Sequence, residues 1–181
     1  MADDSFEDVL KPAAERIDVE ALGEPGSRRF RMLALIDGET HIVWLEKEQL
    51  RRMGEALVHV LAALPDGPAA VETPGEAPFA IESRFQFRAG RMELGYEEPT
   101  DRILVVVHDI DAGAEDAAAF VSSISRIQAT VLAVRVETIV SAGRPICPLC
   151  GEPMTGDSHA CVKQNGHFPH HVEDIGPDIE G

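Results

Sequence analysis

The sequence has no long apolar run and no excess of basic residues, and each absence argues against a class of function. No segment reaches the roughly 20 consecutive apolar residues that a membrane-spanning helix needs, and the start, residues 1–5, is too acidic for a secretory signal. The 16 basic side chains are outnumbered by 32 acidic ones, which gives a formal net charge of −16. Nucleic acid and anionic lipid both attract clustered Lys and Arg. We therefore expect no nucleic acid and no membrane among the partners of this chain.

The sequence also lacks the short motifs that mark common enzyme classes. It contains no G-x-x-x-x-G-K-[ST] or G-x-G-x-x-G for phosphates and dinucleotides, no G-x-S-x-G for a nucleophilic serine and no H-E-x-x-H for a protease metal. Cysteine is scarce as well, with three residues, all between positions 147 and 161. An odd number of cysteines with C-x-x-C spacing favours a metal site over disulfides. Because such thiols persist in a reducing compartment, we expect a cytoplasmic protein.

Alternating apolar residues predict β-strands near the start of the chain. The pattern covers three segments, 17–21, 30–36 and 41–45. The period then changes to that of a helix over about 46–64. The apolar positions of this helix are Leu50, Met53, Leu57, Leu61 and Leu64. Residues 65–78 contain four prolines and two glycines and predict a loop.

The second half of the chain repeats this order of strands followed by a helix. Residues 85–96 alternate on either side of Gly90, which predicts a bulge, and the apolar run 103–107 predicts a central strand. A long helix is predicted over roughly 114–142, with apolar positions at Phe120, Ile124, Ile127, Val131 and Val134. The expected fold class is α+β, with one antiparallel sheet of about five strands and two helices covering one face. A small closed barrel is the alternative.

The cysteine cluster is the most specific chemical signal in the chain. Cys147 and Cys150 have the spacing with which a tight turn presents two thiolates to one tetrahedral zinc ion. Cys161 offers a third thiolate. His159 offers a fourth ligand, because side chains two residues apart in an extended segment point the same way. The alternatives are His167 as the fourth ligand, or three ordinary thiols with a redox role and no metal.

A shell of three cysteines and one histidine favours a structural zinc ion, since it is full and leaves no position for water or substrate. Zinc binding contributes on the order of 10–16 kcal/mol in small zinc modules, which is enough to fold a segment with few apolar residues. The expected domain organisation is a polar segment at 1–14, an α+β domain at 15–143, a zinc-ribbon-like module at 144–169 and a flexible acidic tail at 170–181.

Two further clusters are weaker candidates for a site. His108, Asp109 and Asp111 follow the predicted central strand and offer an imidazole and two carboxylates for a divalent cation or for acid–base chemistry. The simpler interpretation is that these residues lead the strand out to the surface. The three arginines within residues 28–31 form a small basic cluster. Cross-strand ion pairs are expected for them ahead of an anionic ligand.

Several segments together carry a family resemblance. They are Gly23-Glu24-Pro25-Gly26 before Arg29-Phe30, Leu45-Glu46-Lys47-Glu48-Gln49, Phe87-Arg88-Ala89-Gly90 before Met92-Glu93-Leu94, Cys147-Pro148-Leu149-Cys150-Gly151, and His159-Ala160-Cys161 with Asn165-Gly166. Through them the chain resembles a bacterial family known as domain of unknown function 3090. The resemblance implies a compact α+β domain that ends in a zinc-ribbon-like piece. It also favours His159 as the zinc ligand, because the family often has another residue at the position of His167.

The function expected from these observations is that of a binding or adaptor protein with a structural zinc site, whose partner is another protein. The alternative is an enzyme of phosphate or nucleotide metabolism. Such an enzyme would work through His108, Asp109 and Asp111, or through an open position on the zinc ion. The sequence leaves the oligomeric state open.

Overall fold

The computed structural model describes residues 11–24, 26–65 and 77–142, together with residues 147, 149–150, 154, 161 and 163. The chain divides into two compact units, Met1–Gly143 and Arg144–Gly181. All helices and strands of the described residues belong to the first unit. Neither α-helix in these ranges has the length and apolar character that crossing a membrane requires.

The described part of the first unit contains six strands and two α-helices in the order βββα, repeated once. The elements are β1 (Arg16–Leu22), β2 (Arg29–Ile36), β3 (Glu39–Leu45), α1 (Lys47–Ala63), β4 (Phe85–Glu97), a 3-10 turn η1 (Glu98–Thr100), β5 (Arg102–Asp109), β6 (Phe120–Ser125) and α2 (Arg126–Ser141). The repetition agrees with the strand-then-helix order that the sequence predicts for each half.

The six strands form one mixed sheet in the order β1-β2-β3-β4-β5-β6. Every neighbouring pair is antiparallel except β3 and β4, which run parallel through residues 41–44 and 85–88. Parallel strands need a long crossover between them, and α1 lies between β3 and β4 in the chain. The sheet therefore differs from the prediction of about five antiparallel strands by one added strand and one parallel pair.

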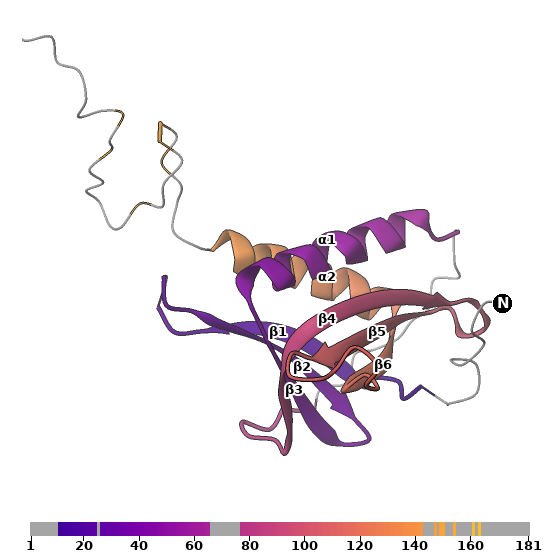
Figure 1. The fold of residues 1–181 in the computed structure, drawn as a ribbon. Helices are drawn as coiled ribbons and strands as arrows, with labels where there is room; N and C mark the ends of the chain where they lie inside the picture. Colours follow the sequence, from indigo (N-terminus) through magenta and orange to yellow (C-terminus); the bar gives the residue numbers. More distant parts are fainter. Residues whose placement is uncertain are drawn as a thin grey trace, which may run out of the picture. The chain divides into compact units, whose positions relative to one another are not determined.

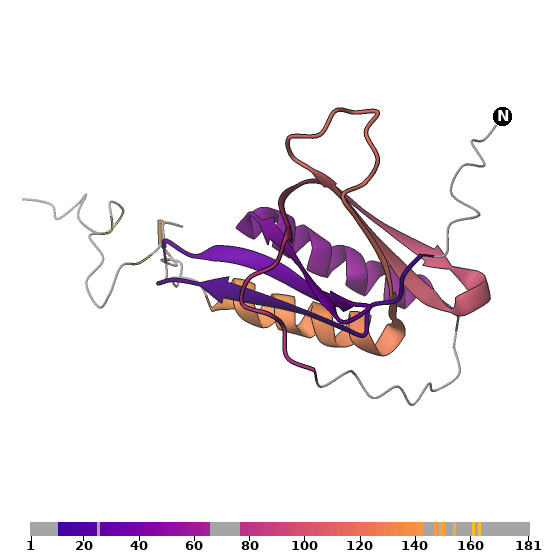
Figure 2. The same ribbon diagram turned by 90° about the horizontal axis from the view of Figure 1, so that it is seen from below.

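Both helices cover the same face of the sheet, as the sequence predicts (Figure 1, and from below in Figure 2). The α+β class is thus confirmed. The alternative of a closed barrel is approached at one point, where Ala13 bridges Ser123 and brings the segment before β1 to β6. Strands β1 and β6 themselves are the two ends of the open sheet.

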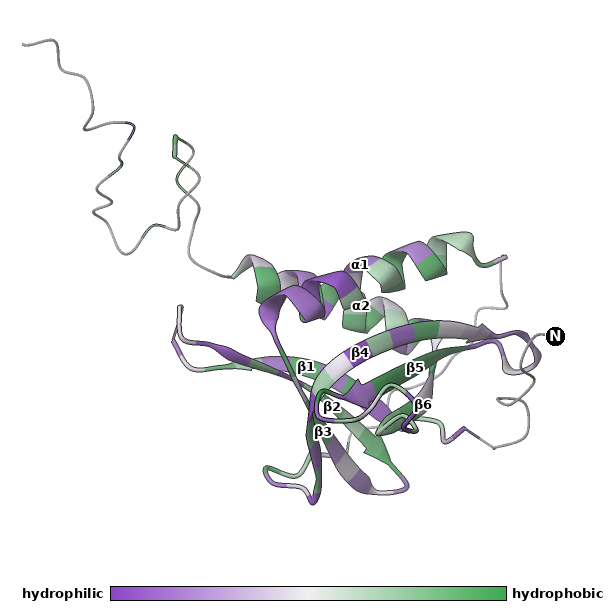
Figure 3. Cartoon of the chain, in the orientation of Figure 1, coloured by the Kyte–Doolittle hydropathy of each residue, from purple (hydrophilic) through white to green (hydrophobic). Residues whose placement is uncertain are grey.

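The hydrophobic core lies between the helices and the sheet. From α1 it contains Leu50, Met53 and Leu57, the positions that the helical period predicts. From β5 it contains alternate residues, including Ile103 and Val105, that face the helices. Figure 3 shows β5 as hydrophobic over most of its length, whereas α1 alternates hydrophilic and hydrophobic turns. This contrast is the pattern of a central strand and of a helix with one solvent-facing side.

The second helix is shorter than the sequence predicts. Residues 120–125 form β6 and not the first turns of a helix over 114–142, and α2 begins at Arg126. The helical interpretation was wrong because Phe120 and Ile124 are also alternate positions on one face of a strand. Ser125 marks the true start of the helix. Its hydroxyl accepts the backbone N–H of Gln128 at 3.2 Å, and the Gln128 side chain accepts the N–H of Ser125 at 2.8 Å, which is a capping box.

Candidate functional site

The three cysteines lie together in the second unit. Their sulfur atoms all lie within 4.8 Å of one another, and the Sγ atoms of Cys147 and Cys161 are 3.8 Å apart. Cys147 and Cys161 are buried, and Cys150 is partly exposed. The structure therefore confirms that the chain brings three thiols close enough to hold one metal ion.

The separation of two of the sulfur atoms fits a tetrahedral metal site. With a Zn–S distance of about 2.3 Å, two sulfur ligands on one tetrahedral ion lie about 3.8 Å apart. The Sγ atoms of Cys147 and Cys161 have this separation. A disulfide needs about 2.05 Å between its sulfurs, and none joins these cysteines. Thiolates are also the ligands that soft metal ions prefer.

Backbone amides prepare Cys147 to act as a ligand. The turn after this residue directs the N–H groups of Cys150 and Leu149 toward its sulfur, and these hydrogen bonds lower the pKa of the Cys147 thiol to about 6. An ordinary cysteine has a pKa of about 8.5, and the thiolate is the form that binds metal. These hydrogen bonds accordingly favour the thiolate form of Cys147 at neutral pH.

The predicted fourth ligand, His159, lies outside the described residues, and so does its alternative, His167. The same holds for most of the predicted module at 144–169 and for the predicted tail at 170–181. Within the described ranges, the three cysteines are the one group of at least three His, Cys, Asp or Glu side chains whose ligand atoms meet.

The residues at the end of β5 do not converge on one point. His108 and Asp109 are neighbours in a strand, so their side chains project from opposite faces. The Nε2 atom of His108 accepts a hydrogen bond from Arg91 on β4 at 2.9 Å. The carboxylate of Asp109 accepts the backbone N–H of Asp111 at 3.0 Å, which is the local turn by which Asp ends a strand. These contacts match the simpler interpretation of the segment.

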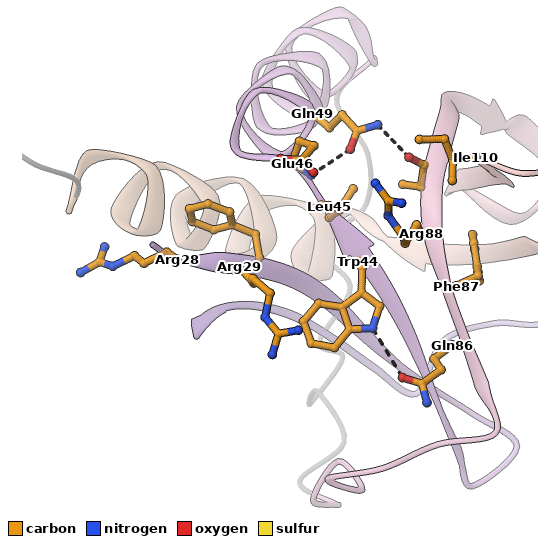
Figure 4. A pocket seen from close by; sticks show the side chains of 12 residues that line it. Arg28, Arg29, Trp44, Leu45, Glu46, Gln49, Gln86, Phe87, Arg88 and Ile110 are labelled. Atoms are coloured by element: carbon orange, nitrogen blue, oxygen red, sulfur yellow. Dashed lines mark hydrogen bonds between the residues drawn. The ribbon is translucent and has the colours of Figure 1, made fainter. Parts of the chain in front are cut away.

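The basic cluster at the start of β2 has two parts. Arg31 pairs with Glu20 across β1 and β2, as expected for a cross-strand ion pair. Arg28 and Arg29 instead line a cleft of about 480 Å³, whose other lining residues include Ile110 (Figure 4). The structure thus brings this basic cluster to the loop that follows β5.

The contribution of β4 to this cleft does not follow from the local sequence, because it depends on the parallel pairing of β3 and β4. That pairing sets Arg88 beside Trp44, and both line the cleft. The bulge predicted at Gly90 is present as a register shift between Ala89 and Met92. A Cβ atom on Gly90 would lie 2.9 Å from the Cα atom of Ile110. Glycine is therefore needed for the loop after β5 to approach the cleft, and it is the one local signal of this arrangement in the sequence.

Comparison with known proteins identifies a family and no function. No curated protein and no solved structure is significantly similar to the chain. A family model described as "Protein of unknown function (DUF3090)" matches residues 11–161. The matched span covers every strand and helix described in the first unit and reaches Cys161, so it includes all three cysteines. The chain therefore belongs to the DUF3090 family of proteins of unknown function.

Proposed function

We propose that this protein is a binding or adaptor protein with one structural zinc ion in its second unit, held by Cys147, Cys150, Cys161 and His159. The observation that carries the proposal is the convergence of three sulfurs within 4.8 Å of one another, two of them at the 3.8 Å separation of ligands on a tetrahedral zinc ion. Three thiolates and one imidazole fill the coordination sphere of zinc and leave no position for water or substrate. A metal site of this kind holds a segment in place and does not catalyse a reaction.

The spacing of His159 and Cys161 supports the fourth ligand, and the free thiols support a cytoplasmic location. His159 lies two residues before Cys161, which places both side chains on one side of an extended segment. A mixed shell of thiolate and imidazole is typical of structural zinc. Three cysteines without a disulfide fit the reducing cytoplasm, which is where we place the protein.

X-ray absorption spectroscopy at the zinc edge tests the ligand set. We expect three sulfur neighbours at about 2.3 Å and one nitrogen at about 2.0–2.1 Å. His159→Ala should replace the nitrogen by a water oxygen, whereas His167→Ala, the matched control, should leave the spectrum unchanged. A water oxygen already present in the wild-type shell would contradict a structural site and would favour the enzyme instead.

The first unit offers a surface for a protein partner between its two helices. A groove of about 790 Å³ runs between α1 and α2, and its lining includes Val58 and Val134, which are 55% and 60% exposed. Exposed apolar side chains around a groove are typical of interaction sites. Glu55 and Glu137 also line the groove, together with Arg51, which forms an ion pair with Glu55. Glu137 and the net charge of −16 of the chain therefore make the surroundings of the groove acidic. Because like charges repel, the groove favours a basic amphipathic helix of another protein over a second copy of this chain.

A synthetic helical peptide with leucines along one face and lysines elsewhere tests this surface. We expect the protein to bind it and Val134→Asp to weaken binding about tenfold or more, because the variant places an unpaired charge against the apolar face. Val131→Asp is the matched control, since Val131 is 56% exposed on the same helix but does not line the groove. Equal binding by both variants, or by a peptide with glutamates in place of the lysines, would exclude this docking surface.

An enzyme of phosphate or nucleotide metabolism is the second candidate function. One observation favours it, namely that the cleft is lined by both Arg28 and Arg29 and by Ile110 of the loop after β5. His108, Asp109 and Asp111 are not among the residues that line the cleft. Purified protein that binds a phosphate ester without turning it over would exclude this candidate.

A further inference from the structure

The cleft lies where the paired strands β3 and β4 separate. Strand β3 ends at Leu45 and the chain passes at once into α1, while its parallel neighbour β4 continues beyond Arg88 to pair with β5. Because the two strands part at this point, a cleft of about 480 Å³ opens between them (Figure 4). Small-molecule sites in proteins have volumes of about 300–1,000 Å³, so the cleft has room for a small ligand.

Three arginines that line the cleft have no carboxylate partner in the described part of the chain. Arg28 donates to the backbone carbonyl of Ala142 at 2.9 Å, and in Figure 4 its guanidinium points away from the other lining residues. The guanidinium carbon of Arg29 lies 4.9 Å from the centre of the Trp44 ring. The side chain of Arg88 forms no hydrogen bond, ion pair or ring contact with any described residue. Arg29 and Arg88 therefore keep their charged donors available to a ligand.

Arginines without a carboxylate partner are unusual in a chain that has 32 acidic and 16 basic side chains. Arginines elsewhere in the described ranges form ion pairs with Asp or Glu; they are Arg16, Arg31, Arg51, Arg52, Arg84, Arg91, Arg126 and Arg135. Arg102 binds the hydroxyl of Ser123 at 3.1 Å. Glu46 is the one carboxylate among the described residues that line the cleft. Despite the excess of acid in the protein, these residues do not balance the positive charge of the three arginines.

We propose that this cleft binds a small, soluble phosphate ester whose organic part is flat or apolar. A guanidinium group stays charged and offers planar donors that match two oxygens of a phosphate. The lining also includes Trp44, Phe87 and Ile110, which suit the organic part of such a ligand.

A phosphate monoester fits better than a carboxylate or a lipid. It carries a charge of about −1.5 to −2 at neutral pH, whereas a single carboxylate carries one negative charge for two arginines. The net charge of −16 repels an anionic bilayer, which favours a soluble ester. All described residues that line the cleft belong to the first unit, so the inference goes beyond the proposed adaptor role and does not depend on the zinc site.

Trp44 allows the proposal to be tested directly, because it is the only tryptophan in the chain. Titration of the metal-replete protein with phenyl phosphate should give a saturable change in its fluorescence. Inorganic phosphate, which lacks the ring, and benzoate, which lacks the phosphate, should each bind about tenfold or more weakly than phenyl phosphate. A linear response to phenyl phosphate, or equal affinity for benzoate, would overturn the proposal.

Calorimetry of variants locates the binding site. Arg88→Gln and Arg29→Gln should each raise the Kd for phenyl phosphate about tenfold or more, since each removes charge-assisted hydrogen bonds. Arg52→Gln is the matched control, because Arg52 is a largely exposed arginine of α1 outside the cleft, and it should keep the wild-type Kd. Circular dichroism and metal content, both unchanged, would show that the variants are folded. An unchanged Kd in Arg88→Gln, or an equal rise in Arg52→Gln, would show that the cleft does not bind the phosphate.

Discussion

Cys147→Ser is expected to lose the metal ion and the ordered structure around it, while the first unit keeps its stability. The variant removes one of three thiolates that meet within 4.8 Å, and a serine hydroxyl is a poor replacement. Structural zinc contributes on the order of 10–16 kcal/mol in small zinc modules. The core of the first unit is built from strands β1–β6 and the two helices and includes none of the cysteines. The stability of this unit therefore does not depend on the metal ion.

Metal analysis and NMR spectroscopy together measure this effect. We expect about one zinc ion per wild-type chain and far less in Cys147→Ser. The amide resonances of residues 144–169 should collapse toward random-coil positions in the variant, and those of 16–141 should stay in place. Ser158→Ala, which changes the residue beside His159 and removes no ligand, is the control and should keep its zinc. Retention of the metal by Cys147→Ser would show that this thiolate is not a ligand.

Ile124→Ala is expected to lower the free energy of unfolding by about 2–5 kcal/mol, because it leaves a cavity in the core. Ile124 is 0% exposed in β6 and faces the helices together with Phe120. Val131→Ala is the matched variant and should change the free energy of unfolding by less than about 0.5 kcal/mol. The reason is that Val131 is 56% exposed on α2.

Urea denaturation followed by circular dichroism gives both values. The comparison separates the observed structure from a helix over 114–142, in which Ile124 and Val131 would share one buried stripe and cost similar amounts. Comparable losses in the two variants would therefore contradict the assignment of residues 120–125 to a strand.

The sequence predicts an element correctly where the spacing of its apolar residues fits only one type of secondary structure. The apolar positions of α1 recur at helical spacing, and Leu50, Met53 and Leu57 are buried as predicted. Strand β6 was missed because its sequence does not alternate. Ser122 and Ser123 are both buried, on opposite faces, so the strand lacks the polar positions by which a half-exposed strand is recognised. The spacing of Phe120 and Ile124 fits a helix and a strand equally.

The parallel pairing of β3 and β4 was not predictable for a different reason. Alternation of apolar residues shows that a segment is a strand, but it does not show which strand lies beside it or in which direction. The cleft is formed by this pairing, since it sets Arg88 beside Trp44. A site that depends on contacts between distant segments was therefore beyond what the local pattern indicates.

The cysteine cluster was predictable because it is largely local. Two of its residues are fixed by the turn between Cys147 and Cys150, and Cys161 follows eleven residues after Cys150. The backbone amides that lower the pKa of Cys147 belong to the same turn. The C-x-x-C spacing of the first two cysteines marks a turn that binds metal, and Cys161 lies close behind it in the sequence. The convergence of the three thiols could therefore be predicted.

The native mass spectrum of the purified wild-type protein tests for the structural zinc ion without any substitution. We expect a single species heavier than the bare chain by one zinc ion, which a strong chelator removes together with the dispersed amide resonances of residues 144–169. A metal-free chain that shows those resonances well dispersed would contradict this expectation.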